Sequence, residues 1–322
     1  MKKITVIGGG TGSFVVLSGL KKYPLDISVV VSMTDSGGST GKLRDQLGVL
    51  PPGDLRQCLL ALSDAPLLWR KLFLYRFESG DFKGHNFGNI FLAALEKVSK
   101  SYDEAIDTAT YVLKTKGKVI PVTLDKLHLS VEYSNGKKVT GEVLIDENHN
   151  ETSRIKKAYL TPEGKANPKA VKSLEKADFI VIGPGDLYTS IIPVLLVDRI
   201  SVTISQSKAK IIFIMNLMTK SGQTSAYKAS DYVNDLERYL GRKPDYILIN
   251  DAPISEEVLS QYTKFSEEKV IDDLKEDDYR LIKGDMIDNR PVKKNSADVL
   301  YRSILRHDSK KVASFIDKIV NV

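Results

Sequence analysis

The chain has 322 residues, of which 42% are apolar, and a formal net charge of +6 at pH 7. This length and apolar content allow a large buried core, which excludes a disordered chain. The basic excess would suit an anionic partner, but lysines and arginines alternate with acidic residues along most of the chain, which argues against nucleic acid and favours a small phosphorylated ligand.

Strand and helix patterns alternate along the sequence. Short apolar runs rich in β-branched residues predict strands, and segments with helical spacing lie between most of them. The expected strands are 4–7, 27–31, 119–122, 179–182, 211–214 and 246–249. The expected helices are 54–62, 67–77, 86–98, 103–113, 229–240, 297–305 and 310–319. This alternation predicts a doubly wound α/β fold with a mainly parallel sheet, as a single domain over residues 1–322.

The first strand ends in a glycine turn formed by residues 8–13, GGGTGS. A helix pattern follows, so free N–H groups at the helix start would point at the turn, an arrangement that holds phosphates. The dinucleotide fingerprint G-x-G-x-x-G is matched only in part, because Ser13 stands in the place of the third glycine. We expect a phosphate here, although a tight turn without a ligand is the alternative. The candidate contacts are Gly9, Gly10, Thr11, Gly12 and Ser13.

A second loop of small and hydroxyl residues follows the second strand. It is not a Walker A loop, which needs glycine in place of Ser36 and a hydroxyl residue after the lysine. Asp35 lies where a dinucleotide fold places the carboxylate that accepts ribose hydroxyls, and a metal ligand or a turn residue are the alternatives. The basic side chains that follow could neutralise phosphate. The candidate contacts are Asp35, Ser36, Gly37, Gly38, Lys42 and Arg44.

Later segments repeat this combination of glycine, hydroxyl and amide groups. Asn86 and Asn89 lie at a predicted helix start, where amides can hydrogen-bond a base or a ribose. Gly183 and Gly185 follow the fourth strand, and Asn216 follows the fifth. Open α/β sheets bind ligands at the carboxyl ends of their strands, so we expect one cleft at this edge.

One region departs from the alternation. Residues 127–133 and 138–145 alternate polar and apolar side chains around Asn135 and Gly136, which indicates a hairpin with a type I′ turn, and residues 154–160 are again extended. We expect an inserted β-hairpin or flap over residues 124–165, with a plain extension of the sheet edge as the alternative.

Other kinds of site find no support in the sequence. Cys58 is the one cysteine and falls in a helical pattern, so we interpret it as a core residue. No nucleophile or paired carboxylate accompanies His85, so no catalytic set is predicted. The apolar runs are far shorter than the roughly 20 residues of a membrane helix, and we expect a cytoplasmic protein without an export signal.

Six segments in their order resemble one known family. They are GGGTGS, TDSGGSTGKLR, PPGDLRQCLLALSD, GHNFGN, GPGDLYTS and NLMTKSGQT, and through them nearly the whole chain is similar to the YvcK-type gluconeogenesis factors, which are related to the CofD phospholactate transferases. The resemblance implies a Rossmann-like domain that binds a nucleotide, with UDP-sugars such as UDP-GlcNAc as expected ligands and no established reaction. It also implies roles in growth on gluconeogenic carbon sources and in cell shape and cell-wall maintenance.

The CofD relatives imply an alternative function. They transfer a phospholactyl-type group from a guanosine diphosphate donor to a deazaflavin with Mg²⁺, which here would need Mg²⁺ at Asp35. An NAD-type dinucleotide is a further candidate ligand, but the residues of hydride chemistry are not recognisable. We expect a homo-oligomer, and protein partners in cell-wall synthesis or signalling.

By position, the resemblance also adds site residues. Tyr188 and Thr189 would complete the cleft beside the two glycines after the fourth strand, and Arg306 would help to hold the nucleotide-sugar, with a solvated helix end as the alternative. Asp186 stands where the family commonly has serine. Its carboxylate would repel a phosphate unless a cation intervened, so we do not predict it as a ligand contact.

Overall fold

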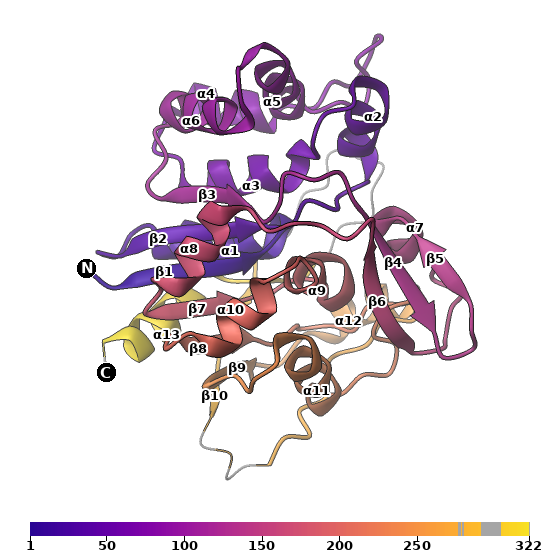
Figure 1. Ribbon diagram of the computed structural model, residues 1–322. Coiled ribbons are helices and arrows are strands. Elements are labelled where there is room, and N and C mark those ends of the chain that lie inside the picture. Colours follow the sequence, from indigo (N-terminus) through magenta and orange to yellow (C-terminus); the bar gives the residue numbers. More distant parts are fainter. Residues whose placement is uncertain (276–277, 279, 291–303, 322) are drawn as a thin grey trace.

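A seven-stranded parallel sheet forms the centre of the computed structural model, which describes residues 1–275, 278, 280–290 and 304–321 (Figure 1). The strand order is β10-β9-β8-β7-β1-β2-β3. The strands are β1 (Lys3–Gly8), β2 (Asp26–Val31), β3 (Lys118–Pro121), β7 (Phe179–Ile182), β8 (Lys210–Ile214), β9 (Tyr246–Asn250) and β10 (Leu281–Gly284). The chain builds outward from β1 to β3, then returns to place β7 on the other side of β1. The order therefore reverses between β1 and β7, the position at which open α/β sheets bind ligands.

Helices cover both faces of this sheet, which confirms the predicted doubly wound α/β class. In β7, Ile180 and Ile182 point into one apolar core, while Val181 points into the other. The first core lies under α8 (Pro168–Glu175), α9 (Ile192–Leu195), α10 (Ile200–Gln206) and α11 (Ala229–Leu240). The second lies under α1 (Gly10–Leu20), α3 (Pro52–Leu62), α4 (Leu67–Leu74), α5 (Phe87–Val98), α6 (Tyr102–Leu113) and α13 (Ser309–Val320).

A separate three-stranded antiparallel sheet lies within residues 124–165. Its order is β5-β4-β6, with β4 (His128–Tyr133), β5 (Lys138–Thr140) and β6 (Ile155–Thr161). The predicted strand 138–145 is wrong in its second half, because Gly141, at φ +109°, turns the chain into α7 (Glu142–Asp146). The turn is also not type I′: Gly136 has φ +85°, but Asn135 has no positive φ, so the loop has three residues instead of two.

One predicted helix is shorter in the structure, and another lies almost entirely outside the described residues. The helix expected over 67–77 ends at Leu74, because the backbone of residues 75–77 pairs with that of residues 85–87. The helix expected over 297–305 falls almost entirely outside the described residues. The remaining described elements are α2 (Gly38–Leu47), a π-helical turn η1 (Leu187–Ile191), α12 (Glu256–Thr263), and the short strands β11 (Ile287–Asp288) and β12 (Arg306–His307).

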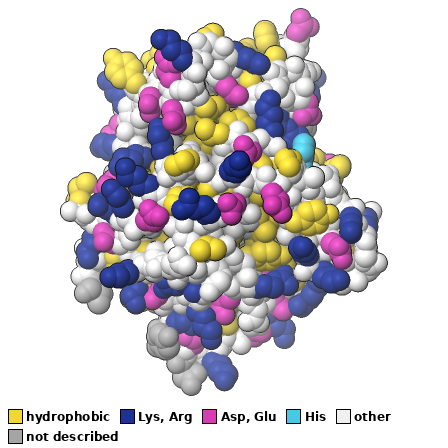
Figure 2. Space-filling model, in the orientation of Figure 1, with side chains coloured by type: hydrophobic (Ala, Val, Ile, Leu, Met, Phe, Trp, Pro, Cys, Tyr) yellow, Lys and Arg dark blue, Asp and Glu magenta, His cyan; other side chains and the backbone are white. Residues whose placement is uncertain are grey.

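In the described part of the chain, no single helix has the length and apolar character needed to cross a membrane, although the sharply bent segment pair Leu187–Leu195 and Ile200–Gln206 meets that test by length and composition. Figure 2 shows acidic and basic side chains interspersed over one face of the molecule.

Candidate functional site

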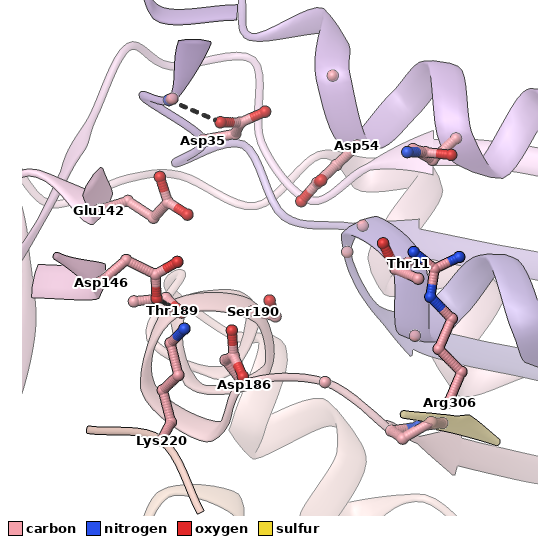
Figure 3. A pocket seen from close by; sticks show the side chains of 18 of the residues that line it. Thr11, Asp35, Asp54, Glu142, Asp146, Asp186, Thr189, Ser190, Lys220 and Arg306 are labelled. Carbon is pink, nitrogen blue, oxygen red and sulfur yellow. Dashed lines mark hydrogen bonds between the residues drawn. The ribbon is translucent and has the colours of Figure 1, made fainter. Parts of the chain in front are cut away.

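The loops at the carboxyl ends of four neighbouring strands converge on a cleft of about 570 Å³ (Figure 3). Residues 9–12 follow β1, Asp35 and Gly37 follow β2, residues 184–186 follow β7, and residues 216–220 follow β8. The volume is within the range of roughly 300–1,000 Å³ typical of small-molecule sites. The cleft therefore lies at the switch point of the sheet and can hold a ligand of nucleotide size.

Glycines let the backbone of these loops approach closely. A Cβ at Gly12 would overlap the carbonyl oxygen of Pro184, and a Cβ at Gly9 would overlap the carboxylate of Asp54. The turn after β1 and the turn after β7 are thus in direct contact across the switch point. A side chain at Gly12 would push the two turns apart, and one at Gly9 would push the first turn away from α3.

Two helices, α1 and α2, begin at the cleft with glycine as the N-cap residue. Gly9 is the N-cap of α1 and Gly37 is the N-cap of α2, so neither N-cap residue has a side chain that could accept from the first turn. The N-cap side chain caps α5, α6, α8, α12 and α13, whereas α3, α4, α7, α9 and α10 also lack such a bond. Uncapped first-turn N–H groups carry the positive end of the helix dipole, which favours an anion at this place.

Seven carboxylates also line the cleft: Asp35, Asp54, Glu142, Asp146, Glu147, Asp186 and Glu267. In Figure 3 Asp35 and Glu142 lie on the same side of the cleft, and the Gly37 N–H donates to Oδ1 of Asp35 at 2.9 Å. Burial, with the neighbouring charge of Asp35, raises the pKa of Glu142 well above its usual value. Burial and the charge of Asp146 raise the pKa of Asp186 to about 6, although Lys220 opposes this shift. These groups resist ionising together, so a cation would stabilise the charged site.

Basic groups are fewer than acidic groups among the lining residues. Lys220 lies 3.5 Å from Glu267, and burial lowers its pKa less than the charges of Asp186, Asp146 and Glu267 raise it, so that its pKa is above the usual value. The Arg306 side chain reaches toward Thr11 at the start of α1 (Figure 3). Arg306 can therefore approach a phosphate held by the first turn.

The structure brings many of the sequence-predicted residues together on the cleft wall. These are Gly9, Gly10, Thr11, Gly12, Asp35, Gly37, Asn89, Gly185, Thr189, Asn216 and Arg306. The other predicted residues do not line it in the described structure: Ser13, Ser36, Gly38, Lys42, Arg44, Asn86, Gly183 and Tyr188.

Several of the residues off the wall have other partners. The Tyr188 side chain is fully buried and its hydroxyl donates to Asp235 at 2.5 Å. Asn86 caps α5 and donates to the Tyr75 carbonyl. The Ser36 hydroxyl accepts from the Val143 N–H, and so ties the second loop to α7. These side chains do not line the cleft; their hydrogen bonds hold the segments that form its wall in place.

Sequence reasoning missed the acidic side of the cleft. Glu142 and Asp146 lie in α7 of the inserted element, which was expected to be a hairpin strand. Their spacing of four residues places both carboxylates on one helix face, a signal that could have been read once Gly141 was taken as a strand end. Lys220, Tyr262 and His307 also line the cleft without having been predicted.

Comparisons with known proteins agree with this architecture. A family model described as 2-phospho-L-lactate transferase CofD matches residues 4–287. The putative gluconeogenesis factor of Thermotoga maritima is 44% identical over 263 residues, covering 81% of this chain and 83% of that protein. The gluconeogenesis factor of Bacillus subtilis is 38% identical over 320 residues, covering 98% and 96%. A crystal structure of a UPF0052 family member from Bacillus halodurans superposes with a TM-score of 0.89 at 38% identity, covering 98% of this chain and 99% of that one.

Proposed function

Since this chain belongs to the CofD family and is closely similar to gluconeogenesis factors, we propose that its cleft binds a uridine diphosphate sugar such as UDP-GlcNAc, and that binding, not turnover, is its output. The observation that carries the proposal is the pair of helix starts with glycine N-caps, α1 and α2, together with the glycine contact between the turns after β1 and β7. A pyrophosphate fits this arrangement because its oxygens accept from main-chain N–H groups.

The two walls of the cleft differ in a way that suits a nucleotide-sugar. One part is an apolar cluster that includes Leu217, Met218, Tyr262 and Leu305. The wall around Asp35 instead presents carboxylate, amide and guanidinium groups, among them Asn89 and Arg56. Apolar side chains suit the face of a base, and the polar groups suit sugar hydroxyls.

A transferase of the CofD type is the second candidate, and the seven carboxylates that line the cleft favour it. A diphosphate entering this acidic cleft would need a counter-charge, which Mg²⁺ would supply at Asp35. In the described residues, no three histidine, cysteine or carboxylate side chains are arranged to hold a metal by themselves. Phosphate oxygens would therefore complete the coordination of the ion.

The name shared by the relatives suggests the physiological setting. From this name we infer a role in growth on gluconeogenic carbon sources. We further propose a role in cell-shape and cell-wall maintenance, exerted from the cytoplasm through protein partners that respond to ligand occupancy. A homo-oligomer is part of this proposal. The exposed apolar side chains Leu67, Leu68 and Leu74 of α4 offer a surface for such contacts.

A thermal-shift panel tests the proposal. UDP-GlcNAc, UDP-glucose, GDP and NAD would each be added with and without Mg²⁺, at concentrations about 100-fold above the expected Kd, where binding stabilises by about 2.7 kcal/mol. We expect the UDP-sugars to raise Tm by several degrees and to be recovered intact. Conversion of a donor with Mg²⁺ would favour the transferase, and a shift with NAD alone would favour a dehydrogenase.

A further inference from the structure

His307 presents an unusual hydrogen-bonding situation in the cleft wall. It lies in β12, paired with Ile287 of β11, and its side chain is 94% buried, with a relative exposure of 6%. Its ring has the main-chain carbonyl of Met215, the residue that follows β8, as a hydrogen-bond partner. Its Nε2 has no partner among the described residues. A polar atom buried without a partner costs free energy, so a partner is expected in the functional state.

The bond to Met215 settles the role of the unpaired nitrogen. A carbonyl accepts only from an N–H, so Nδ1 carries the proton and Nε2 is left as an acceptor. Burial lowers the pKa of the ring to about 4 despite this hydrogen bond. The imidazole is thus neutral near pH 7, and Nε2 requires a donor from the ligand.

A second unpaired acceptor belongs to the same cleft wall. Asn216 follows Met215, and its Nδ2 donates to the Gly185 carbonyl at 2.9 Å. This bond fixes the amide so that Oδ1 is the remaining atom, which is buried and has no partner in the described structure. Both side chains line the cleft. This part of the wall therefore presents two hydrogen-bond acceptors that no described protein group satisfies.

The surroundings indicate which part of a ligand carries those donors. Ile287, opposite His307, belongs to the same apolar cluster as Leu217, Tyr262 and Leu305. A flat heterocycle can pack on such a cluster and direct its edge at the acceptors, whereas a sugar would expose its hydroxyls to apolar side chains. The acceptors are therefore placed for a nucleobase and the ribose attached to it.

We propose that His307 determines base specificity by accepting, through Nε2, a hydrogen bond from a ring N–H of the nucleobase, with Asn216 accepting a second donor of the same nucleoside. This inference rests on the proposed nucleotide-sugar function. Uracil and guanine carry a ring N–H on their pairing edge, whereas cytosine and adenine carry a bare ring nitrogen there. The cleft selects bases of the first class, because the others would leave Nε2 facing another acceptor.

Calorimetric titration with UDP, CDP and the diphosphate of 3-methyluridine tests the inference. The methyl compound keeps the uracil shape but lacks the ring N–H. We expect the unmodified chain to bind UDP at least about 10-fold more tightly than either analogue, as one hydrogen bond to a buried acceptor implies. In His307→Phe the preference should fall to about 2-fold or less, and His128→Phe, on the exposed side of β4, should keep it.

The possible outcomes separate the inference from the function it rests on. Equal binding of UDP and both analogues by the unmodified chain would overturn the role of His307 and leave the nucleotide cleft intact. Failure of UDP, GDP and UDP-GlcNAc alike would instead overturn the proposed function. If His307→Phe does not fold, the comparison of UDP with 3-methyluridine diphosphate on the unmodified chain still decides the question.

Discussion

Gly12, in the first turn of α1, packs directly on the main-chain carbonyl of Pro184 in the turn after β7. This contact joins the two turns that flank the switch point of the sheet. It explains why glycine is needed at a helical position where it otherwise weakens a helix. The shape of the cleft depends on it, because both turns line the cavity.

A Gly12→Ala substitution is the first test. The added methyl would overlap the Pro184 carbonyl oxygen, so we expect the free energy of unfolding to fall by about 1–3 kcal/mol, as overpacking does, and UDP-GlcNAc affinity to fall at least about 10-fold. Urea unfolding and calorimetry measure both. Ser18→Ala, in the same helix and only partly buried, serves as the control. Unchanged affinity in Gly12→Ala would show that the two turns do not grip the ligand together.

Asp186 predicts a pH dependence of binding. Burial and the charge of Asp146 hold its pKa near 6, so the group is mostly neutral at pH 5 and charged at pH 8. The pyrophosphate of UDP-GlcNAc keeps its charge over this range, so repulsion should weaken binding in the absence of Mg²⁺ by about 10-fold as the pH rises. Asp186→Asn should flatten this profile, and Mg²⁺ should reduce its slope. If affinity falls as steeply with rising pH in Asp186→Asn as in the unmodified chain, another carboxylate causes the effect.

Arg306 is expected to contribute affinity through its charge. Its side chain reaches toward Thr11 at the uncapped start of α1 (Figure 3). We expect Arg306→Gln to weaken UDP-GlcNAc binding by about 10–100-fold, since charge-assisted hydrogen bonds to phosphate are among the strong ones. Arg290→Gln removes an exposed guanidinium from the neighbouring loop and should leave the Kd within 2-fold. Equal losses of affinity in the two variants would indicate a long-range electrostatic effect on the ligand and no direct contact with Arg306.

His307 should make the native state sensitive to acid. Burial lowers its pKa from 6.5 to about 4, so between these values the unfolded chain binds a proton that the native chain does not. The free energy of unfolding therefore falls as the pH drops from 6.5 toward 4, and His307 contributes up to about 3 kcal/mol to this fall. Urea unfolding at pH 7 and pH 4.5 should show a smaller loss for His307→Gln than for the unmodified chain. The same loss in both would contradict the buried, neutral ring.

Cys58 should be inert in the folded protein. It is fully buried in α3, and burial, with the charge of Asp54, raises the pKa of its thiol well above the usual value. Because thiolate is the reactive form, a thiol reagent should not label the native chain over hours, yet should label it at once in urea. Mass spectrometry reads this cleanly, since the chain has one cysteine. Rapid labelling under native conditions would mean that α3 opens.

The central sheet could be predicted from the sequence because its strands are buried on both faces. Runs such as those around Val6 and Val181 are continuous and apolar, and they have few other places in a folded chain. The loops at their carboxyl ends could be expected at one edge for the same reason. The pattern of buried strands alone therefore predicts at which edge of the sheet the cleft lies.

The orientation of individual side chains could not be predicted in this way. Tyr188 and Thr189 are neighbours in one motif, but η1 directs the tyrosine into the core and the threonine to the cleft. Glu142 and Asp146 reach the site only because Gly141 ends a strand that the alternating pattern seemed to continue. The side-chain directions in η1 depend on the position of each residue around the helix, and α7 depends on the φ angle of Gly141. The order of the motifs along the sequence predicts neither.

A crystal structure of the chain with UDP-GlcNAc is the most direct test of the central claim. We predict the pyrophosphate between the start of α1 and the turn after β7, Arg306 in contact with it, and the uracil on the apolar cluster with its ring N–H directed at His307. A ligand bound outside this cleft, or a cleft that stays closed to UDP-GlcNAc at saturating concentration, would contradict the account.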